Sequence, residues 1–256
     1  MIVLTEIIKL VKIFFNSKSN KMKNLFIIIL VLIGLKVSSQ NLQVLYDVGE
    51  DRNHITTTVE MFKPDKYGNT FFFIDMNYGG DGVKGVSLAY WEIARVFSTK
   101  KFPLGLNVEF NGGFGRKVLD RVPGKPTIAY GINNAWLIGP TYSMNAKDFS
   151  KGFTVKALYK AIEGQEGFGY QLTGVWYIHF LNRKVTFKGF ADFWRQDSDF
   201  NFDGKVDATH VFLAEPQLWY HLNKHFDIGG EVELSNNFAL VEGFKIRPAL
   251  GIKWNF

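Results

Sequence analysis

The chain has 256 residues, of which 46% are hydrophobic and 16% aromatic, with 25 glycines, 7 prolines and no cysteine. This length suits one domain or one closed barrel, and a charged fraction of 21% argues against wholesale disorder. The absence of cysteine excludes a disulfide scaffold, a thiolate zinc site and a cysteine nucleophile.

The net charge of +6 is concentrated at the N-terminus. Residues 1–39 carry six lysines and one glutamate, which leaves 24 of the 30 basic and 23 of the 24 acidic residues in the rest of the chain. The remainder is therefore almost neutral, and no nucleic-acid partner is predicted from bulk charge.

The first element in chain order is a predicted export signal. Lys21 and Lys23 precede an apolar run from Leu25 to Leu35, and small residues follow up to Ser39. This pattern predicts a cleavable signal peptide with Gln40 as the first mature residue. We therefore interpret residues 1–39 as an N-terminal extension plus signal peptide, with Met22 as the natural start. An N-terminal membrane anchor is the alternative.

Residues 40–256 follow a two-residue period, which is typical of β-strands, and fit the helical period poorly. The predicted strands, in chain order, are residues 42–48, 55–63, 70–78, 86–97, 104–114, 127–143, 152–162, 168–180, 185–195, 209–222, 226–235 and 244–256. Their number is even, as a single-chain bacterial barrel requires. The connectors predicted to lie outside the cell are longer on average than the periplasmic turns.

The last predicted strand decides the fold class. From Phe244 to Phe256 apolar residues alternate with Lys245, Arg247, Lys253 and other residues over 13 positions. A strand of a soluble sandwich runs about 5–6 residues, whereas a membrane-crossing strand needs about 9–11. We therefore predict an all-β fold, a transmembrane antiparallel β-barrel of about 12 strands in the outer membrane of a Gram-negative bacterium. A soluble β-sandwich or lipocalin-like barrel is the alternative.

Strand parity then predicts which side chains face the lumen. The predicted lumen and substrate residues are Glu60, Phe73, Asp75, Glu92, Glu109, Lys156, Lys188, Asp192, Trp194, Glu215, Glu231, Glu233 and Arg247. Two interpretations stay open at this point. The charges pair with one another and plug the lumen, or they line a narrow polar pore that selects small solutes. The same parity predicts that Leu250→Arg disturbs the lipid face and that Gly251→Ser, on the lumen face, is milder.

A loop between two predicted strands has the spacing of a calcium-binding loop. Asp199, Asn201, Asp203 and Asp207 provide oxygen ligands and Gly204 occupies the turn position. The acidic residue expected at the twelfth position is replaced by His210, so the alternative is a solvated acidic turn. No other cofactor is predicted.

The sequence does not favour an enzyme. A barrel lipase needs histidine, serine and asparagine converging at the outer face, and no His-x-Ser-Asn-Gly run is present. Asp51 with His54 and Asp207 with His210 are the only pairs that match a rim protease.

Two segments resemble a family of uncharacterised outer-membrane proteins. These are Thr56-Thr57-Thr58-Val59-Glu60-Met61-Phe62-Lys63-Pro64-Asp65 with the following Gly68–Asp75, and Gly85–Arg95. That family is similar to the nucleoside-specific channel-forming (Tsx-like) porins. The resemblance implies a monomeric 12-stranded barrel and nucleosides as the solute.

The sequence therefore predicts an outer-membrane channel for passive diffusion of small hydrophilic solutes. The expected partners are the lipid bilayer, the solute and the barrel-assembly machinery. The terminal residues Trp254-Asn255-Phe256 resemble the signal that this machinery recognises. The alternative from a different class is a non-conducting structural or adhesion barrel, and a soluble periplasmic binding barrel is a third.

Overall fold

The computed structural model describes residues 40–49, 52–80, 82–99, 102–200, 204 and 206–256. The predicted signal peptide thus lies outside the described residues. The chain divides into two units, residues 1–38 with Phe256 and residues 39–255, and every strand belongs to the second unit. Within the described ranges, the structure contains no helix with the length and hydropathy of a membrane span.

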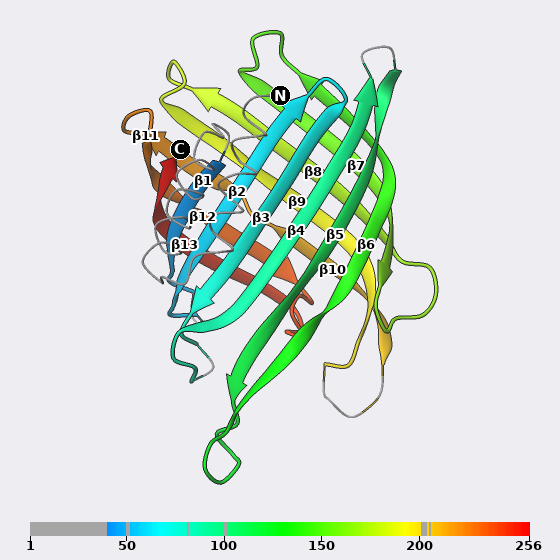
Figure 1. Cartoon of the computed structure of the whole chain (residues 1–256), viewed down its shortest axis with the longest axis vertical. Coiled ribbons are helices and arrows are strands. Elements are labelled where there is room, and N and C mark those ends of the chain that lie inside the picture. The colour runs from blue at the N-terminus through cyan, green and yellow to red at the C-terminus, as the bar shows by residue number, and fades with distance from the viewer. Residues whose placement is uncertain (1–39, 50–51, 81, 100–101, 201–203, 205) are drawn as a thin grey trace, which may run out of the picture. The chain divides into compact units, whose positions relative to one another are not determined.

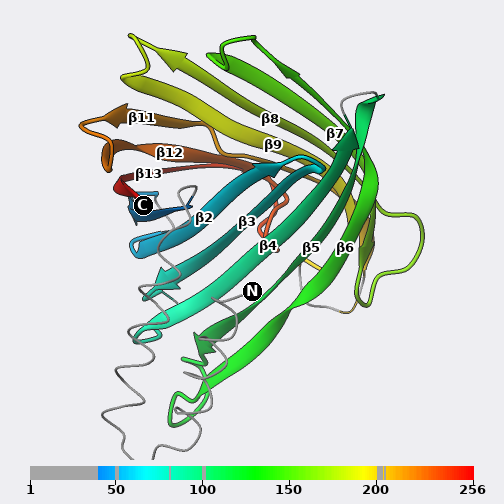
Figure 2. The same ribbon diagram turned by 45° about the horizontal axis from the view of Figure 1, so that its top comes forward.

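The second unit is a single antiparallel sheet of 13 strand segments. They are β1 Gln40–Asp47, β2 Ile55–Asp65, β3 Gly68–Tyr78, β4 Val86–Thr99, β5 Phe102–Val118, β6 Thr127–Asn145, β7 Lys151–Ile162, β8 Tyr170–Phe180, β9 Val185–Ser198, β10 Asp207–Ala214, β11 Gln217–His221, β12 Phe226–Asn236 and β13 Phe244–Asn255. The tilted strands wrap around a common axis (Figures 1 and 2).

The sheet closes on itself because β1 pairs with both β2 and β13. β10 and β11 each pair with both β9 and β12, so they are two halves of one barrel strand. The interruption falls at Glu215 and Pro216, and proline has no N–H to donate to a ladder. The barrel therefore has 12 strands, and the predicted run 209–222 is one of them.

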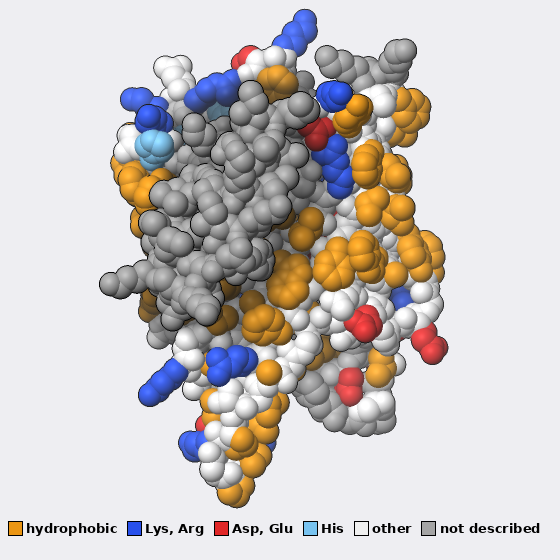
Figure 3. Space-filling view, viewed as in Figure 1, with side chains coloured by type: hydrophobic (Ala, Val, Ile, Leu, Met, Phe, Trp, Pro, Cys, Tyr) orange, Lys and Arg blue, Asp and Glu red, His pale blue; other side chains and the backbone are white. Residues whose placement is uncertain are grey.

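The two faces of the barrel differ as strand parity predicted. On β13, Leu250 is 66% exposed and Ile252 is 52% exposed, whereas Ala249 and Lys253, which have the opposite parity, are 3% and 5% exposed. Apolar side chains gather on the right-hand side of the space-filling view, over β5 to β7 (Figure 3). With every strand edge paired and an apolar outer belt, the barrel satisfies what a bilayer demands of a spanning structure. The chain is an outer-membrane β-barrel.

The β5–β6 hairpin is longer than the rest of the wall. β5 has 17 residues and β6 has 19, and the hairpin projects beyond the other strands at the bottom of Figure 1. The register of the two strands shifts between Asn111 and Gly113. Such a β-bulge bends the strand and increases its twist.

Apolar side chains fill two parts of the inner face. Leu45, Trp219 and Ala249 form one buried cluster, and Trp219 has no exposed surface. Ala135, Leu137 and Leu158 form another on the opposite side of the sheet order. The lumen is therefore narrowed by packed side chains as well as by charges.

An ion pair joins the β2–β3 hairpin to β4 outside the membrane-spanning part of the strands. The Arg95 guanidinium donates to both carboxylate oxygens of Asp65, over 2.7 and 3.0 Å. These hydrogen bonds lower the pKa of Asp65 from 3.8 to about 2. The carboxyl therefore binds its proton more readily in the unfolded chain than in the barrel.

We expect Asp65 to stabilise the barrel fully above pH about 4 and progressively less between pH about 4 and 2. Denaturant unfolding of the wild type and of Asp65→Asn, followed across this range, measures the effect. The two unfolding midpoints should differ at pH 6 and converge near pH 2. A difference that stays constant down to pH 2 would show that the ionised Asp65 contributes nothing.

Candidate functional site

The lumen is the place where the predicted site residues come together. Twelve of them lie on strands at the inward parity, and Glu215 lies at the break between β10 and β11. They are Glu60 on β2, Phe73 and Asp75 on β3, Glu92 on β4, Glu109 on β5, Lys156 on β7, Lys188, Asp192 and Trp194 on β9, Glu231 and Glu233 on β12, and Arg247 on β13.

One ion pair joins walls that are far apart in the sheet. Lys188 donates to both carboxylate oxygens of Glu60, over 2.8 and 3.0 Å. Four barrel strands separate β9 from β2 by the shorter route around the sheet. The two long side chains therefore meet in the lumen, and their ion pair forms a bar across the lumen from β2 to β9.

A second group of charges lies along β4, β5 and β7. Lys156 donates to Glu109 over 3.2 Å, and the Asn107 amide donates to the same carboxylate oxygen over 3.2 Å. Glu92 instead accepts hydrogen bonds from neutral donors, the Tyr90 hydroxyl at 2.8 Å and the Asn111 amide at 3.1 Å.

Three further acidic side chains also have neutral hydrogen-bond donors. Thr58 donates to Asp75 and Thr173 donates to Asp192, each over 2.5 Å. The Gln217 amide donates to Glu231 over 2.8 Å. These hydroxyl and amide donors hold the carboxyl groups in place and bring no positive charge of their own.

Two lysines are held over tryptophan rings. Lys160 lies 4.2 Å from the ring centre of Trp194, and Lys253 lies 3.8 Å from that of Trp219. A cation over an aromatic face is attracted by the ring quadrupole. Trp194 therefore anchors a base on the lumen wall, which strand parity alone could not indicate.

Aromatic rings form a short ladder on β3 and β4. The centre of Phe73 lies 6.1 Å from that of Phe71 and 6.0 Å from that of Tyr90, with tilted planes. The Tyr90 hydroxyl is bound to Glu92, so the ladder ends on a polar group. This wall combines flat apolar faces with hydrogen-bond acceptors.

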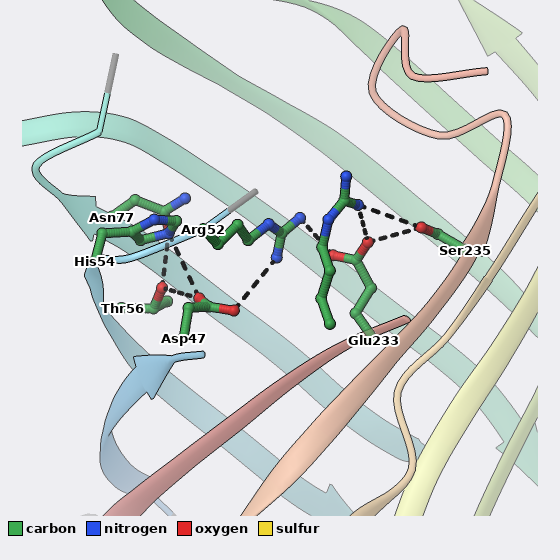
Figure 4. A network of polar contacts seen from close by, with 8 residues as sticks. Asp47, Arg52, His54, Thr56, Asn77, Glu233 and Ser235 are labelled. Atoms are coloured by element: carbon green, nitrogen blue, oxygen red, sulfur yellow. Dashed lines mark hydrogen bonds and ion pairs between the residues drawn. The ribbon is translucent and has the colours of Figure 1, made fainter. Parts of the chain in front are cut away.

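A polar network occupies one end of the lumen (Figure 4). Arg52, from the connector between β1 and β2, reaches the Glu233 carboxylate at 2.6 Å and Asp47 at 3.7 Å. Arg247 donates to the other oxygen of Glu233 over 2.6 Å. Asp47 is also bound by Thr56 and lies 3.4 Å from His54. Two arginines thus balance two carboxylates, and the network ties the connector to β12 and β13.

A hydrogen-bonded chain crosses β8, β9, β11 and β12 at the opposite end of these strands. The Thr186 hydroxyl contacts His179 Nδ1 at 2.8 Å and His221 Nε2 at 2.7 Å. His221 Nδ1 contacts Asp227 at 2.7 Å. Both histidines are therefore polar lumen residues held in one hydrogen-bonded chain.

The comparison with family models decides the relationship of the chain to known proteins. Residues 39–256 match the model described as "Domain of unknown function (DUF5020)". The chain belongs to the DUF5020 family. The match spans the entire barrel from β1 to β13. No curated protein matches the chain.

Solved structures similar to this DUF5020 barrel include two outer-membrane proteins. The KdgM porin in complex with disordered oligogalacturonate is 13% identical, with a TM-score of 0.48, over 85% of this chain and 99% of that one. The Acinetobacter baumannii outer membrane protein Omp33 is 13% identical, with a TM-score of 0.42, over 86% of this chain and 98% of that one. At these values the fold assignment rests on the strand pairing of the barrel itself.

The predicted set of lumen residues omitted Asp47, Asp227 and Arg52 of this DUF5020 barrel. Asp47 and Asp227 are 5% and 2% exposed and end the hydrogen-bonded chains at the two ends of the lumen. Both share the parity of other inward residues on β1 and β12, so the alternation itself was a sufficient indication. Arg52 had no such indication, because it lies in a connector.

The predicted calcium loop is only partly described. Asn201 and Asp203 lie outside the described residues. Asp199 accepts a hydrogen bond from the Gly204 N–H at 2.8 Å, which is a turn contact, and Asp207 begins β10. Calcium binding by this loop stays a prediction.

Proposed function

We propose that this DUF5020 barrel is a channel for passive diffusion of small hydrophilic solutes across the outer membrane. The observation that carries the proposal is the separation of side chains across the wall. Charged and hydrogen-bonding groups from β2 to β13 face inward, whereas the outward face is apolar. Lining donors, acceptors and charges determine which solutes enter such a pore.

Within this class, nucleosides are the proposed solutes. The resemblance to Tsx-like porins supports them, and the Phe71–Phe73–Tyr90 ladder supplies aromatic faces on which a flat base can stack. Glu92 beside the ladder offers acceptors for sugar hydroxyls. The predicted lumen residues Phe73, Asp75 and Glu92 would make these contacts.

Assembly would follow the usual route of such barrels. We propose that the barrel-assembly machinery recognises β13 and the terminal residues Trp254-Asn255-Phe256. The alternating outward residues Phe244, Ile246, Leu250, Ile252 and Trp254 support this partner, since all are 48% exposed or more.

A non-conducting barrel is the second candidate, and the bar of Glu60 and Lys188 favours it. This ion pair spans the lumen, and Trp219 and Leu137 fill parts of the inner face. In that case the chain would act through its loops as a structural or adhesion protein.

Purified protein in planar bilayers and in liposomes separates the two candidates. A channel gives discrete conductance steps, and liposomes carrying it swell in small solutes but not in large ones. Faster uptake of nucleosides than of hexoses of similar size supports the finer proposal, and equal rates contradict it. The absence of both conductance and solute flux would leave the structural barrel.

A further inference from the structure

We propose that the lumen selects for cations, so that cationic solutes pass in preference to anionic ones. This inference rests on the proposed channel function, because it concerns what the channel admits. It arises because most basic side chains on the inner wall have charged or aromatic partners, whereas several acidic side chains have only neutral hydrogen-bond donors.

Five basic side chains on the inward face of the described strands are already engaged, whereas Lys245, exposed near the start of β13, forms no ion pair. Three are in ion pairs with carboxylates, namely Lys156, Lys188 and Arg247. Two lie over tryptophan rings, namely Lys160 and Lys253. An ammonium that is held by a carboxylate has little charge left to attract an anionic solute. Most positively charged groups of the lumen are thus held by carboxylates or tryptophan rings of the barrel wall.

Among the described residues, five inward carboxyl groups form no ion pair. Asp75, Glu92, Asp192 and Glu231 accept hydrogen bonds from hydroxyl or amide groups. Among the described residues, Glu215 has no side-chain hydrogen bond or ion pair. The five carboxylates exceed the two lysines over tryptophan and Lys245 together, so the unpaired formal charge of the described lumen is negative.

These carboxylates face one another from opposite walls. Glu92 on β4 and Asp192 on β9 repel each other, with Lys160 partly offsetting the repulsion, and four barrel strands separate β4 from β9 by the shorter route. Glu215, between β10 and β11, interacts in the same way with Asp75 on β3. A solute that passes along the axis therefore meets carboxylates on both sides, which is how acidic rings favour cations in channels.

A second, independent observation is a surplus of hydrogen-bond acceptors. The amide nitrogens of Gln43, Asn107 and Asn111 donate to neighbouring side chains. Their amide oxygens have no hydrogen-bond partner, although the three side chains are 1%, 0% and 4% exposed. These oxygens are enclosed by the wall, and no donor offsets their partial negative charge. They therefore add to the negative electrostatic potential of the lumen.

The arrangement fits passing cations and not a chelated metal. Among the described residues, no group of three or more acidic and histidine side chains is placed to hold a metal ion. The carboxylates are distributed along the lumen, so each attracts a cation weakly. Conduction requires this, because a solute must also leave the channel.

The test is the reversal potential of single channels in a gradient of KCl. We expect K⁺ to be more permeant than Cl⁻ by roughly tenfold, because a cleft lined by one sign of charge concentrates counter-ions by at least that factor. Liposome flux of lysine should likewise exceed that of glutamate.

Paired variants change the preference in opposite directions. Asp75→Asn with Glu215→Gln removes charge from opposite walls and should lower the K⁺ over Cl⁻ ratio several-fold. Lys160→Gln removes a base and should raise it. Asp148→Asn is the matched control, because Asp148 lies in the exposed turn between β6 and β7 and should leave the ratio unchanged.

The possible outcomes are distinct. Conductance with equal or greater permeability of Cl⁻ overturns the cation inference while the channel proposal stands. Conductance that prefers K⁺ but is unchanged in both lumen variants also overturns it, since the carboxylates would not be the cause. The absence of any conductance overturns the channel proposal itself. Only folded and inserted barrels give single-channel steps, so the permeability ratio of each variant is measured on folded protein alone.

Discussion

Replacement of Leu250 by arginine is expected to lower the free energy of unfolding of the barrel by about 2–4 kcal/mol. Leu250 lies in the middle of β13 with 66% of its surface exposed, on the face that contacts lipid. Hydrocarbon offers no hydrogen-bond partners to a guanidinium, so the charge must reach toward the interface or remain poorly solvated. Equilibrium unfolding by urea or guanidinium chloride in lipid vesicles measures the loss.

Two control variants isolate the effect of depth in the membrane. Leu250→Phe keeps an apolar side chain against lipid and should change stability little. Phe244→Arg places the same charge near the end of β13, where it should cost at most about 1 kcal/mol. If Leu250→Arg and Phe244→Arg proved equally harmless, β13 would not cross a hydrocarbon core in this orientation.

Replacement of Lys188 by methionine is expected to increase single-channel conductance about twofold, because removing the ion pair that crosses the lumen widens the passage there. The same change leaves the Glu60 carboxylate, whose side chain is 18% exposed, without its cation. Loss of a charge-assisted partner from a partly buried group should lower stability by about 1–3 kcal/mol. Conductance and unfolding are measured on the same preparations.

The double variant Glu60→Gln with Lys188→Met separates width from stability. It removes the unpaired carboxylate, so part of the lost stability should return while conductance stays above that of the wild type. If neither variant altered conductance, the ion pair would not lie in the conduction path. A closed wild type with an open Lys188→Met variant would instead identify Glu60 and Lys188 as a plug.

The strands and their faces were predictable from the sequence because a bilayer imposes a strict rule on both. Every one of the 12 predicted runs coincides with a barrel strand, and the exposed and buried positions of β13 follow the alternation from Phe244 to Asn255. The one departure is the break at Pro216, which divides a predicted strand into β10 and β11. Proline could have indicated it, since it donates no ladder hydrogen bond.

The pairing of charges was not predictable. Parity places Glu60 and Lys188 inside the barrel, but 128 positions separate them in the sequence and only the closed sheet brings them within 2.8 Å. The stacking of Lys160 on Trp194 depends in the same way on the packing of neighbouring strands. Pairing decides which carboxylates remain uncompensated, so the charge preference of the lumen needed the structure.

The sequence alone did not indicate how little room Gly251 has, although it predicted Gly251→Ser to be milder than Leu250→Arg. A Cβ atom at Gly251 would lie 2.2 Å from the Val44 carbonyl oxygen of the adjacent strand. Backbone cannot move aside as a flexible side chain can, so even a small residue is expected to disturb the β1–β13 closure. The lumen face tolerates polar groups, but only where the neighbouring strand leaves room.

Labelling of single cysteines along β13 tests most directly whether lipid surrounds the apolar face and water the other. The chain has no cysteine, so each introduced thiol is the only one. In vesicles, thiols at Ile246, Leu250 and Ile252 should respond to a quencher dissolved in the lipid, and those at Lys245, Arg247 and Lys253 to a reagent dissolved in water. An accessibility without a two-residue period, or with the two sets exchanged, would contradict the membrane-spanning barrel.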